Sequence, residues 1–337
     1  MSFILATAEN LAQGDDFLIE KSRDAQATSV FLQSSSWLTV QENYGRKVYS
    51  WFYQDQKGGE IKGVVAGIVM PLPFGKSYFF SPRGPILEKK LLAEFLQTSS
   101  WLETIKKENI IFWRFEPLAD FKAFNLSACR QVADHEPSQT AVLDLSLNAD
   151  LLFASLKQKT RYNINLAKRH EIKIDFVSQG DLTQLKKIFW QLTTATGARH
   201  HLKHFPKNYY DNLIDILAKK GMLEVAIAKH QQDILAINLN ILFGHSVIYL
   251  LGASAEQKKN LMAPYLLQWQ AISRAQKAGF RWYDFYGIAT GAQHKLAGVT
   301  KFKQGFAGQT VNYPGTFEKT ISPFWYFIYK TGKQIRF

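Results

Sequence analysis

The sequence predicts an α/β (α+β) protein of two domains, each a mixed, mainly antiparallel sheet flanked by helices. The chain has 337 residues, which is long for one domain and suits two of roughly 150 residues each. Its hydrophobic content of 46% and aromatic content of 14% are sufficient for two cores. Short β-branched and aromatic runs also alternate with longer stretches of helical periodicity along the whole chain.

The first third of the chain alternates strands and helices. Turn residues separate extended runs at 48–53, 61–73 and 77–86. A helix is expected over 91–109, and the run IIFWRFEP (110–117) predicts a buried strand that proline ends. The following residues are polar and irregular until a short strand begins at 140, so this part predicts helices packed on one sheet.

The second half has a clearer order of elements. A basic helix is expected from near Asp150, followed by one strand, two helices, three strands joined by the tight connections QQD and GH, a helix and a last strand. This order is similar to that of a GNAT-like acyltransferase core, and the first third resembles a looser copy of it. We therefore expect two GNAT-like domains, the second preceded by a linker near 134–139. Their expected bounds are 1–139 plus 312–337 for the first and 140–311 for the second.

The charge and the cysteine content limit the classes of partner and compartment. The chain carries 41 Lys and Arg against 28 Asp and Glu, a net charge of +13. Such an excess favours nucleic acid, an anionic lipid surface or a pyrophosphate-bearing substrate, although a solubilising surface would also explain it. The single cysteine, Cys129, fits a reducing compartment. No apolar run approaches the ~18–20 residues of a spanning helix, and the N-terminus lacks a basic signal-peptide region, so we expect a cytoplasmic protein.

Short motifs in a fixed order carry a family resemblance. They are FLQSSSWLTVQ (31–41), SPRGPI (81–86), WRFEP (113–117), K-x-K-x-R-x-x-I (157–164), YDFYGI (283–288), FKQGFAG (302–308) and NYPGTF (312–317). Together they resemble the FemAB-type aminoacyltransferases, which add amino acids to peptidoglycan precursors. The resemblance implies an aminoacyl-tRNA donor, a muropeptide precursor as acceptor and no cofactor. We expect a monomer that acts in the cytoplasm, either free or at the inner face of the membrane.

The basic helix presents cations on one face. At 100° per residue, Lys157, Arg161 and Lys168 fall within about 40° of one another. These three residues, here called the basic ridge, suit phosphate groups. The resemblance implies that they meet the tRNA acceptor stem. A pyrophosphate ligand and a merely solvated face are the alternatives.

The pair Phe302 and Lys303 supplies the candidate catalytic cation. We expect Lys303 at a strand end beside the turn QGFAG, where its ammonium would stabilise the oxyanion that forms during acyl transfer. An ordinary surface lysine is the alternative. Lys301 would share the same face of the strand and contact substrate. Asp284 in YDFYGI is the candidate general base, or else it caps a backbone turn. Because an aminoacyl ester is already activated, this reaction needs positioning more than a strong base.

The resemblance also implies an acceptor groove. It assigns Tyr209, Arg114, Glu116 and Gln41 to substrate binding, whereas packing or capping roles are the alternatives. Two positions depart from the family pattern. Gln41 stands where members often have lysine, and Phe205 where some have arginine. Both changes remove a cation, which leaves open how the phosphates of the precursor are held.

A histidine-rich segment and the C-terminal tail also show distinct residue patterns. His200, His201 and His204 have the spacing of metal ligands but no nearby cysteine or acid, so we expect no metal. The tail SPFWYFIYKTGKQIRF (322–337) combines apolar residues with a basic end. It either docks on the body of the protein or contacts a membrane surface.

Two other function classes compete with the aminoacyltransferase. A GNAT-type N-acyltransferase would use an acyl-CoA donor, whose pyrophosphate binds a glycine-spaced turn before a helix. The stretch GASAEQKKNLMAPY (252–265) lacks that spacing, which disfavours CoA. A noncatalytic nucleic-acid-binding module is the other class, but the basic residues follow no RRM, KH or OB pattern.

Overall fold

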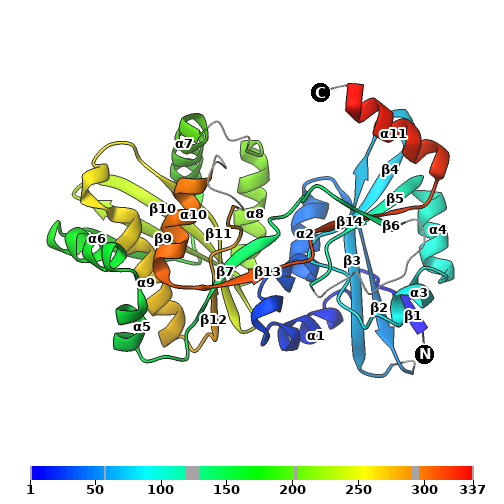
Figure 1. Ribbon diagram of the computed structural model, residues 1–337, viewed down its shortest axis with the longest axis horizontal. Coiled ribbons are helices and arrows are strands. Elements are labelled where there is room, and N and C mark those ends of the chain that lie inside the picture. Colours follow the sequence, from blue (N-terminus) through cyan, green and yellow to red (C-terminus); the bar gives the residue numbers. More distant parts are fainter. Residues whose placement is uncertain (1, 57, 119–128, 201–203, 290–295, 336–337) are drawn as a thin grey trace. The chain divides into compact units, whose positions relative to one another are not determined.

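The computed structural model describes residues 2–56, 58–118, 129–200, 204–289 and 296–335. The chain forms two compact units (Figure 1). Unit 1 comprises Met1–Lys21, Val30–Ser138 and Tyr313–Phe337, and unit 2 comprises Ser22–Ser29 and Gln139–Asn312. The segment Ser22–Ser29 belongs to unit 2, which the expected bounds did not include. The reason is a set of hydrogen bonds within unit 2, such as the one from His245 N to Ser22 Oγ (2.9 Å).

Unit 1 is built on a seven-stranded mixed sheet. Its order is β1-β2-β3-β4-β5-β14-β6, and the neighbours are antiparallel except for the parallel pair β4 and β5. The strands are β1 (Ser2–Leu5), β2 (Lys47–Gln54), β3 (Ile61–Pro71), β4 (Ser77–Ser81), β5 (Ile110–Phe115), β6 (Cys129–Val132) and β14 (Thr316–Thr320).

Helices cover both faces of this sheet, and short 3-10 turns connect them. The α-helices are α1 (Gln13–Lys21), α2 (Ser35–Asn43), α3 (Leu91–Phe95), α4 (Ser99–Lys107) and α11 (Pro323–Ile335), with 3-10 turns η2 (Val30–Gln33) and η3 (Pro73–Gly75). The single helix expected over 91–109 is thus two helices. The first helix ends at Phe95, and the backbone is extended at Thr98 (φ −67°, ψ 138°) before the second helix begins at Ser99.

Large aromatic side chains fill the two faces of the unit 1 sheet. Trp51, Phe79 and Trp113 pack on one face with Trp101 of α4, and all four are nearly inaccessible to solvent. On the other face, Phe112 and Tyr78 stack with ring centroids 4.8 Å apart, and Tyr326 of α11 contacts Phe112 edge-on at 5.3 Å. The aromatic runs seen in the sequence therefore lie inside unit 1.

Unit 2 is built on a second seven-stranded sheet. Its order is β13-β7-β12-β11-β10-β9-β8, again with one parallel pair, β11 and β12. The strands are β7 (Gln139–Asp144), β8 (Lys173–Val177), β9 (Leu223–His230), β10 (Asp233–Phe243), β11 (Ser246–Ser254), β12 (Trp282–Asp284) and β13 (Gln309–Asn312). The meander β9-β10-β11 has the tight connections that the sequence predicted.

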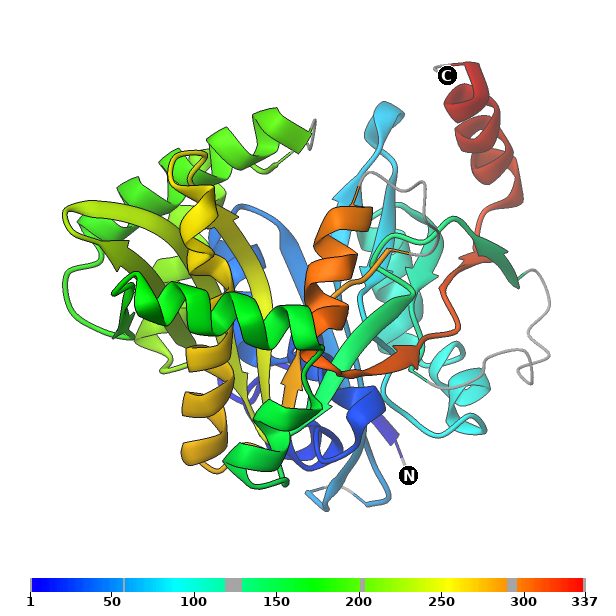
Figure 2. The same ribbon diagram turned by 60° about the vertical axis from the view of Figure 1, so that its left-hand side comes forward.

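The helices of unit 2 surround this sheet, and α6 lies across α9 (Figure 2). They are α5 (Ala149–Ser155), α6 (Gln158–Arg169), α7 (Thr183–His200), α8 (Lys207–Lys219), α9 (Ala263–Lys277) and α10 (Ala297–Lys303), with 3-10 turns η1 (Ala25–Ala27), η4 (Lys259–Leu261) and η5 (Gln304–Phe306). The core includes Ile164 of α6, Leu267 of α9 and Tyr283 of β12. Across the described part of both units, no helix is long and apolar enough to cross a membrane.

Candidate active site

The parallel strands β11 and β12 pair only over a short stretch, from Ser246 opposite Trp282 to Ile248 opposite Asp284. Beyond these residues β11 continues to Ser254 while β12 ends. Tyr249 is the first residue of β11 past the shared ladder, and a bulge in the pairing with β10 follows it. Such a divergence of parallel strands leaves backbone groups of both strands without a strand partner, so side chains from other elements can enter there.

Lys303 lies at this divergence. Its Nζ donates to the carbonyl oxygens of Gly287 (2.7 Å) and Tyr286 (3.1 Å), and it lies 5.5 Å from the centre of the Tyr249 ring. The side chain is buried, with 9% exposed. Burial lowers the pKa of Lys303 to about 8, while the carboxylate of Asp284 opposes this shift. An ammonium has three N–H donors, so one remains for a ligand after these two bonds.

Asp284 is the last residue of β12 and is fully buried. Its carboxylate accepts hydrogen bonds from Thr28 Oγ1 (2.6 Å), Ser29 Oγ (2.8 Å), Thr140 Oγ1 and the backbone N of Tyr286 (2.7 Å). Four donors to one carboxylate hold the end of β12, the start of β7 and the segment 22–29 together. This geometry favours the turn-capping role over that of a general base.

Phe302 and Lys303 lie on helix α10, not at the strand end that the sequence analysis expected. Phe302 is half-buried and contacts Tyr265 (5.0 Å between ring centres) and Phe306 (5.3 Å). Because the segment is helical, Lys301 does not share the face of Lys303, and it is exposed. The prediction that the two lysines share one face is therefore wrong. The aromatic contacts of Phe302 fix the helix that carries Lys303.

The expected basic helix is two helices, α5 and α6, because the chain is extended at Leu156 and Lys157. The backbone N of Lys157 donates to Gly305 O (3.0 Å), which ties the start of α6 to η5, directly after Lys303. Arg161 Nη1 donates to the carbonyls of Leu156 and Ala154 (2.8 Å) at the end of α5. The cation of Arg161 is thus partly engaged.

The other two cations of the basic ridge are exposed. Lys157 precedes the first turn of α6 and Lys168 lies in its last turn, where it also lies 5.7 Å from the Phe153 ring. Thr160, Asn163 and Ile164 form the buried face of the same helix. The basic ridge therefore starts beside the candidate active site of unit 2 and runs along the exposed side of α6.

Tyr209 lies in the first turn of α8 in unit 2 and is buried. Its ring stacks on Phe205 with centres 4.1 Å apart, and Tyr210 packs against it edge-on at 5.7 Å. Phe205, which stands where some family members have arginine, therefore forms an aromatic cluster with Tyr209 instead of presenting a cation.

In unit 1, Arg114 on β5 is committed to a buried network. It forms an ion pair with Glu318 of β14 and donates to Tyr329 Oη (3.2 Å). Its guanidinium also lies 4.7 Å from the ring of Tyr78. These contacts join the sheet to α11. They favour a structural role for Arg114 over the substrate contact predicted for it.

Glu116 follows β5 and is also buried, with 2% exposed. Its Oε1 accepts from Thr316 Oγ1 (2.8 Å) and from the backbone N of Glu136 (2.8 Å). Its Oε2 has no hydrogen-bond partner among the described residues. Burial and the charge of Glu136 raise the pKa of Glu116 to about 7, although Arg83 opposes the shift. A buried oxygen of this kind can accept a donor from a ligand.

Gln41 of α2 is fully buried, and Arg46 Nη1 donates to its Oε1 at 2.5 Å. Gln41 stands where family members often have lysine, and the guanidinium of Arg46 bonds its side-chain amide.

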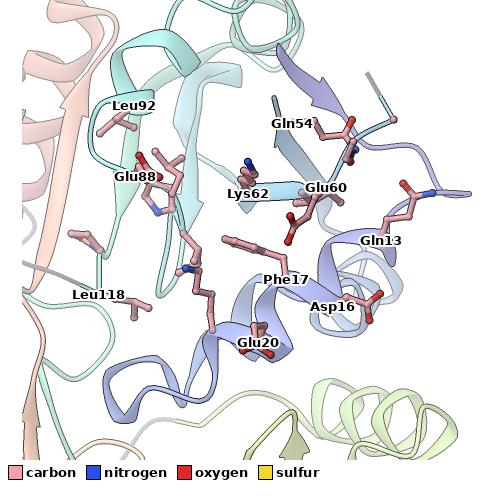
Figure 3. A pocket seen from close by; sticks show the side chains of 18 residues that line it. Gln13, Asp16, Phe17, Glu20, Gln54, Glu60, Lys62, Glu88, Leu92 and Leu118 are labelled. Atoms are coloured by element: carbon pink, nitrogen blue, oxygen red, sulfur yellow. Dashed lines mark hydrogen bonds between the residues drawn. The ribbon is translucent and has the colours of Figure 1, made fainter. Parts of the chain in front are cut away.

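A groove of about 950 Å³ in unit 1 was not foreseen from the sequence (Figure 3). Helix α1, the start of β3 and the segments after β4 and β5 line it, and Phe17 projects into it. Its charged lining consists of four carboxylates and two ammonium groups, those of Asp16, Glu20, Glu60, Glu88, Lys21 and Lys62. None of the predicted site residues lines this groove, and its excess of carboxylates does not favour phosphate.

Other residues escaped the sequence analysis. Arg83 is buried, lies 3.8 Å from the Tyr313 ring and donates to Pro137 O (2.6 Å). The motif SPRGPI contains Arg83, but nothing local shows that the side chain turns inward. Thr28 and Ser29 were missed because their bonds to Asp284 span more than 250 residues.

The histidine segment offers no evidence of a metal site. His201 lies outside the described residues, and the side chain of His200 is not described either. The ring of His204 lies 3.0 Å from the carbonyl of Phe205. Within the described ranges, no three His, Cys, Asp or Glu side chains gather closely enough to hold a metal ion.

Comparison with solved structures identifies the fold. A structure described as FemX covers 99% of its own length and 97% of this chain, with a TM-score of 0.80 and 17% identity. A tandem GNAT protein from the clavulanic acid biosynthesis pathway matches with a TM-score of 0.53 at 9% identity, covering 95% of this chain and 98% of that one. L-PGS from Bacillus licheniformis matches at 0.55 and 11%, covering 93% and 92%. The predicted fold of two GNAT-like domains with mixed sheets is confirmed.

Sequence comparison identifies the family. Aminoacyltransferase FemA of Staphylococcus epidermidis is 34% identical over 92 residues, and that of Staphylococcus aureus is 30% identical over 92 residues. Each match spans 27% of this chain and only 22% of the relative. The model of the FemAB family matches residues 125–232 and 221–334, which is more than half of the chain. The chain therefore belongs to the FemAB family.

Proposed function

We propose that the protein is an aminoacyltransferase that moves an amino acid from aminoacyl-tRNA to the amine of the peptide stem of a peptidoglycan precursor. Family membership and the names of the aminoacyltransferase relatives support the reaction class. The observation that carries the proposal is the buried ammonium of Lys303, which lies where β11 and β12 diverge and retains one N–H donor.

The chemistry requires little beyond placement. The amine nitrogen attacks the carbonyl carbon of the aminoacyl ester and forms the new C–N bond, while the carbonyl oxygen becomes an oxyanion. The ester C–O bond then breaks, and the ribose hydroxyl of the tRNA leaves with the proton given up by the amine. In a buried site, the third N–H of Lys303 stabilises the oxyanion without reorganisation. With a pKa of about 8, Lys303 is largely protonated at pH 7.

Asp284 acts as a positioning residue in this scheme. Four donors already occupy its oxygens, so it is a poor acceptor for the proton of the attacking amine. Its bond to Tyr286 N shapes the turn whose carbonyls hold Lys303. Phe302 contributes by packing α10 against Tyr265.

The donor would bind along the basic ridge. The exposed cations Lys157 and Lys168 suit the phosphates of a tRNA acceptor stem. The bond from Lys157 N to Gly305 O links the start of this ridge to the segment after Lys303. A charged tRNA also places the reaction in the cytoplasm, where we expect the protein to act as a monomer.

Glu116 of unit 1 is the candidate contact for the acceptor, and Tyr209 and Lys301 of unit 2 are alternative ones. Glu116 offers a buried oxygen that has no partner in the described part of the chain and suits an amine or amide N–H of the peptide stem. In unit 2, Tyr209 with Phe205 offers an apolar surface. In unit 1, Gln41 is fully buried and bonded to Arg46, so a direct contact with the acceptor is disfavoured. Lys301, exposed on α10, is available to a phosphate. Whether the precursor is linked to a nucleotide or to a lipid follows from none of these contacts.

The alternative, an acyl-CoA donor, fits the start of α9 poorly. A pyrophosphate at this position would bind backbone N–H groups of the first helical turn. Pro264 removes one of these donors, and the N–H of Tyr265 is already bonded to Met262 O (3.0 Å). The geometry therefore supports a tRNA-borne donor over CoA.

A direct transfer assay tests the proposal. Purified protein is supplied with tRNA charged with radiolabelled amino acids and with a muropeptide precursor, and acetyl-CoA turnover is measured in parallel. We expect label in the precursor only when charged tRNA is present. Turnover of acetyl-CoA without any tRNA-dependent transfer would refute the proposal. Mass spectrometry of muropeptides from a deletion strain would then identify the amino acid and its position.

A further inference from the structure

Three phenylalanine side chains on unit 1 are exposed to an unusual degree. Phe74, Phe324 and Phe327 are 77%, 68% and 69% exposed. Phe324 and Phe327 are three residues apart on α11 and therefore project from the same side of the helix. Phe74 lies in the turn η3 between β3 and β4. Together with Trp325, these residues are called the aromatic patch.

Ring contacts join parts of the aromatic patch that are 250 residues apart in the sequence. The ring of Trp325 lies 6.3 Å from that of Phe74 and 5.5 Å from that of Phe324. Trp325 is itself half-buried and packs against the cluster around Phe112. Figures 1 and 2 show α11 close to strand β4 of unit 1, and the ring contacts join this helix to the turn between β3 and β4.

The backbone conformation of Phe74 indicates that packing within unit 1 does not require a phenylalanine in this turn. Phe74 has φ 61° and ψ 32°, in the left-handed region that glycine and asparagine adopt most easily. A phenylalanine there costs free energy, and its ring remains 77% exposed, so packing within unit 1 returns little. The exposed ring itself is therefore the feature that this turn presents.

Two lysines flank the aromatic patch. Lys76 directly follows the turn that carries Phe74, and Lys330 lies three residues after Phe327 on α11. Lys76 Nζ lies 4.5 Å from the Trp325 ring. Lys330 lies 3.4 Å from the buried Glu318, which partly neutralises it. The charge next to the exposed rings complements an anionic surface.

We propose that the aromatic patch docks unit 1 onto the surface of an anionic phospholipid bilayer. Aromatic rings with adjacent cations suit the interfacial layer, where the rings displace water and the cations meet phosphate headgroups. An amphipathic helix such as α11 lies in the plane of that layer. This inference does not depend on the transfer reaction, but docking would bring the protein to an acceptor that is linked to a lipid.

Vesicle binding tests the proposal. Wild-type protein is sedimented with phosphatidylcholine vesicles and with vesicles that also contain phosphatidylglycerol. We expect binding to the anionic vesicles that weakens with salt. The triple variant Phe74→Gly, Phe324→Gln and Phe327→Gln should bind at least about tenfold more weakly. Lys76→Gln should weaken binding by about fivefold. Glycine suits the backbone at position 74, so the variant should fold.

A matched control removes exposed apolar side chains outside the aromatic patch. Leu102 of α4 and Leu151 of α5 are 41% and 56% exposed, and the double variant Leu102→Gln and Leu151→Gln should bind vesicles as the wild type does. Brominated lipids provide a second measurement. They should quench part of the tryptophan fluorescence on binding, and Trp325→Phe should remove that part.

Three results would overturn the proposal. The first is equal binding of the wild type and the triple variant to anionic vesicles. The second is equal binding of the wild type to neutral and anionic vesicles. The third is self-association of the wild type that the triple variant abolishes without vesicle binding, which would assign the aromatic patch to a second copy of the chain. Transfer to a soluble acceptor should be unchanged in the triple variant, so failure of the transfer reaction would not count against docking.

Discussion

Unit 1 and unit 2 repeat one strand order and place a carboxylate at a corresponding point. Each sheet has a single parallel pair, β4 with β5 and β11 with β12. Glu116 directly follows β5, and Asp284 ends β12. Each carboxylate accepts a hydrogen bond from a threonine of the neighbouring antiparallel strand. The donor to Glu116 is Thr316 of β14, and the donor to Asp284 is Thr140 of β7.

The two carboxylates differ in how far the protein satisfies them. Asp284 receives four donors, whereas Glu116 receives two and its Oε2 receives none from the described residues. A saturated buried carboxylate stabilises the backbone around it, while an unsaturated one is costly unless a proton or a ligand joins it. The corresponding carboxylate of the repeated fold is therefore fully bonded in unit 2, whereas in unit 1 it keeps one oxygen without a partner from the described residues.

The buried cations Lys303 of unit 2 and Arg83 of unit 1 also differ in their contacts. In unit 2, Lys303 retains one donor after bonding two carbonyls at the end of β12. In unit 1, Arg83 is stacked on Tyr313 and bonded to Pro137 O. The candidate catalytic cation therefore lies in unit 2, and the incompletely bonded carboxylate lies in unit 1.

The largest expected effect follows from removing the cation of unit 2. Lys303→Ala should lower the rate of transfer more than tenfold, since a donor to an oxyanion commonly contributes ~2–4 kcal/mol to transition-state stabilisation. Transfer from charged tRNA measures the effect, with Lys277→Ala, an exposed lysine of α9, as the control. A folded Lys303→Ala variant with wild-type rates would remove Lys303 from the mechanism.

The unsaturated carboxylate of unit 1 should make stability depend on pH. The pKa of Glu116 is about 7 in the folded protein, against 4.5 for the unperturbed group. The folded state then binds more protons between these values, so stability is highest below about pH 4.5 and falls as pH rises to about 7. The loss can reach about 3 kcal/mol. Denaturant unfolding of Glu116→Gln should lack this fall. An equal pH dependence in the wild type and the variant would contradict the assignment.

The saturated carboxylate of unit 2 should matter for stability instead. Asp284→Asn keeps the size of the side chain but removes the charge that four donors share, which should cost about 1.5–3 kcal/mol of unfolding free energy. Asp181→Asn is the control, because the exposed Asp181 accepts from the backbone N of Thr183 at 2.9 Å. A stable Asp284→Asn variant with strongly reduced transfer would instead restore Asp284 as the general base.

The rate of transfer should also fall at alkaline pH, because Lys303 then loses its proton and its positive charge. With a pKa of about 8 for Lys303, the rate should fall up to about tenfold per pH unit above that value. The Lys303→Arg variant should retain its activity to a higher pH than the wild type does, because a guanidinium remains protonated. If the rate of the Lys303→Arg variant falls over the same alkaline pH range as that of the wild type, another group causes the fall.

Local patterns predicted most of the two sheets, but not the contacts that complete the site. The meander β9-β10-β11 follows from three β-branched runs with tight turns between them. The segment Ser22–Ser29 could not be assigned to unit 2 because its bonds to Asp284 depend on the folded chain. The break before α6 is similar, since Lys157 N finds its partner at Gly305 O, nearly 150 residues later.

The helix α10 could have been predicted. Val299, Phe302 and Phe306 have the spacing i, i+3 and i+7 of a helical face, with Lys303 on the same side. The expectation of a strand followed instead from the glycine-rich turn. Its consequence was the wrong grouping of Lys301 with Lys303. The Glu116 and Asp284 comparison, by contrast, required the structure, because the strand partners of both carboxylates come from distant parts of the chain.

The smallest expected effect concerns α6, the helix of unit 2 whose start is bonded to the segment after Lys303. Lys157→Gln with Lys168→Gln should weaken binding of charged tRNA and reduce the log–log salt slope by about 1.4–1.8, as each phosphate contact contributes ~0.7–0.9. Arg161 requires its own variant, Arg161→Lys, because its guanidinium also bonds the end of α5. The exposed pair Lys106→Gln and Lys277→Gln is the control and should leave the slope nearly unchanged. An unchanged slope in the Lys157 and Lys168 variant would make the basic ridge a solvated face. A loss of acceptor binding instead would assign the ridge to the phosphates of the precursor.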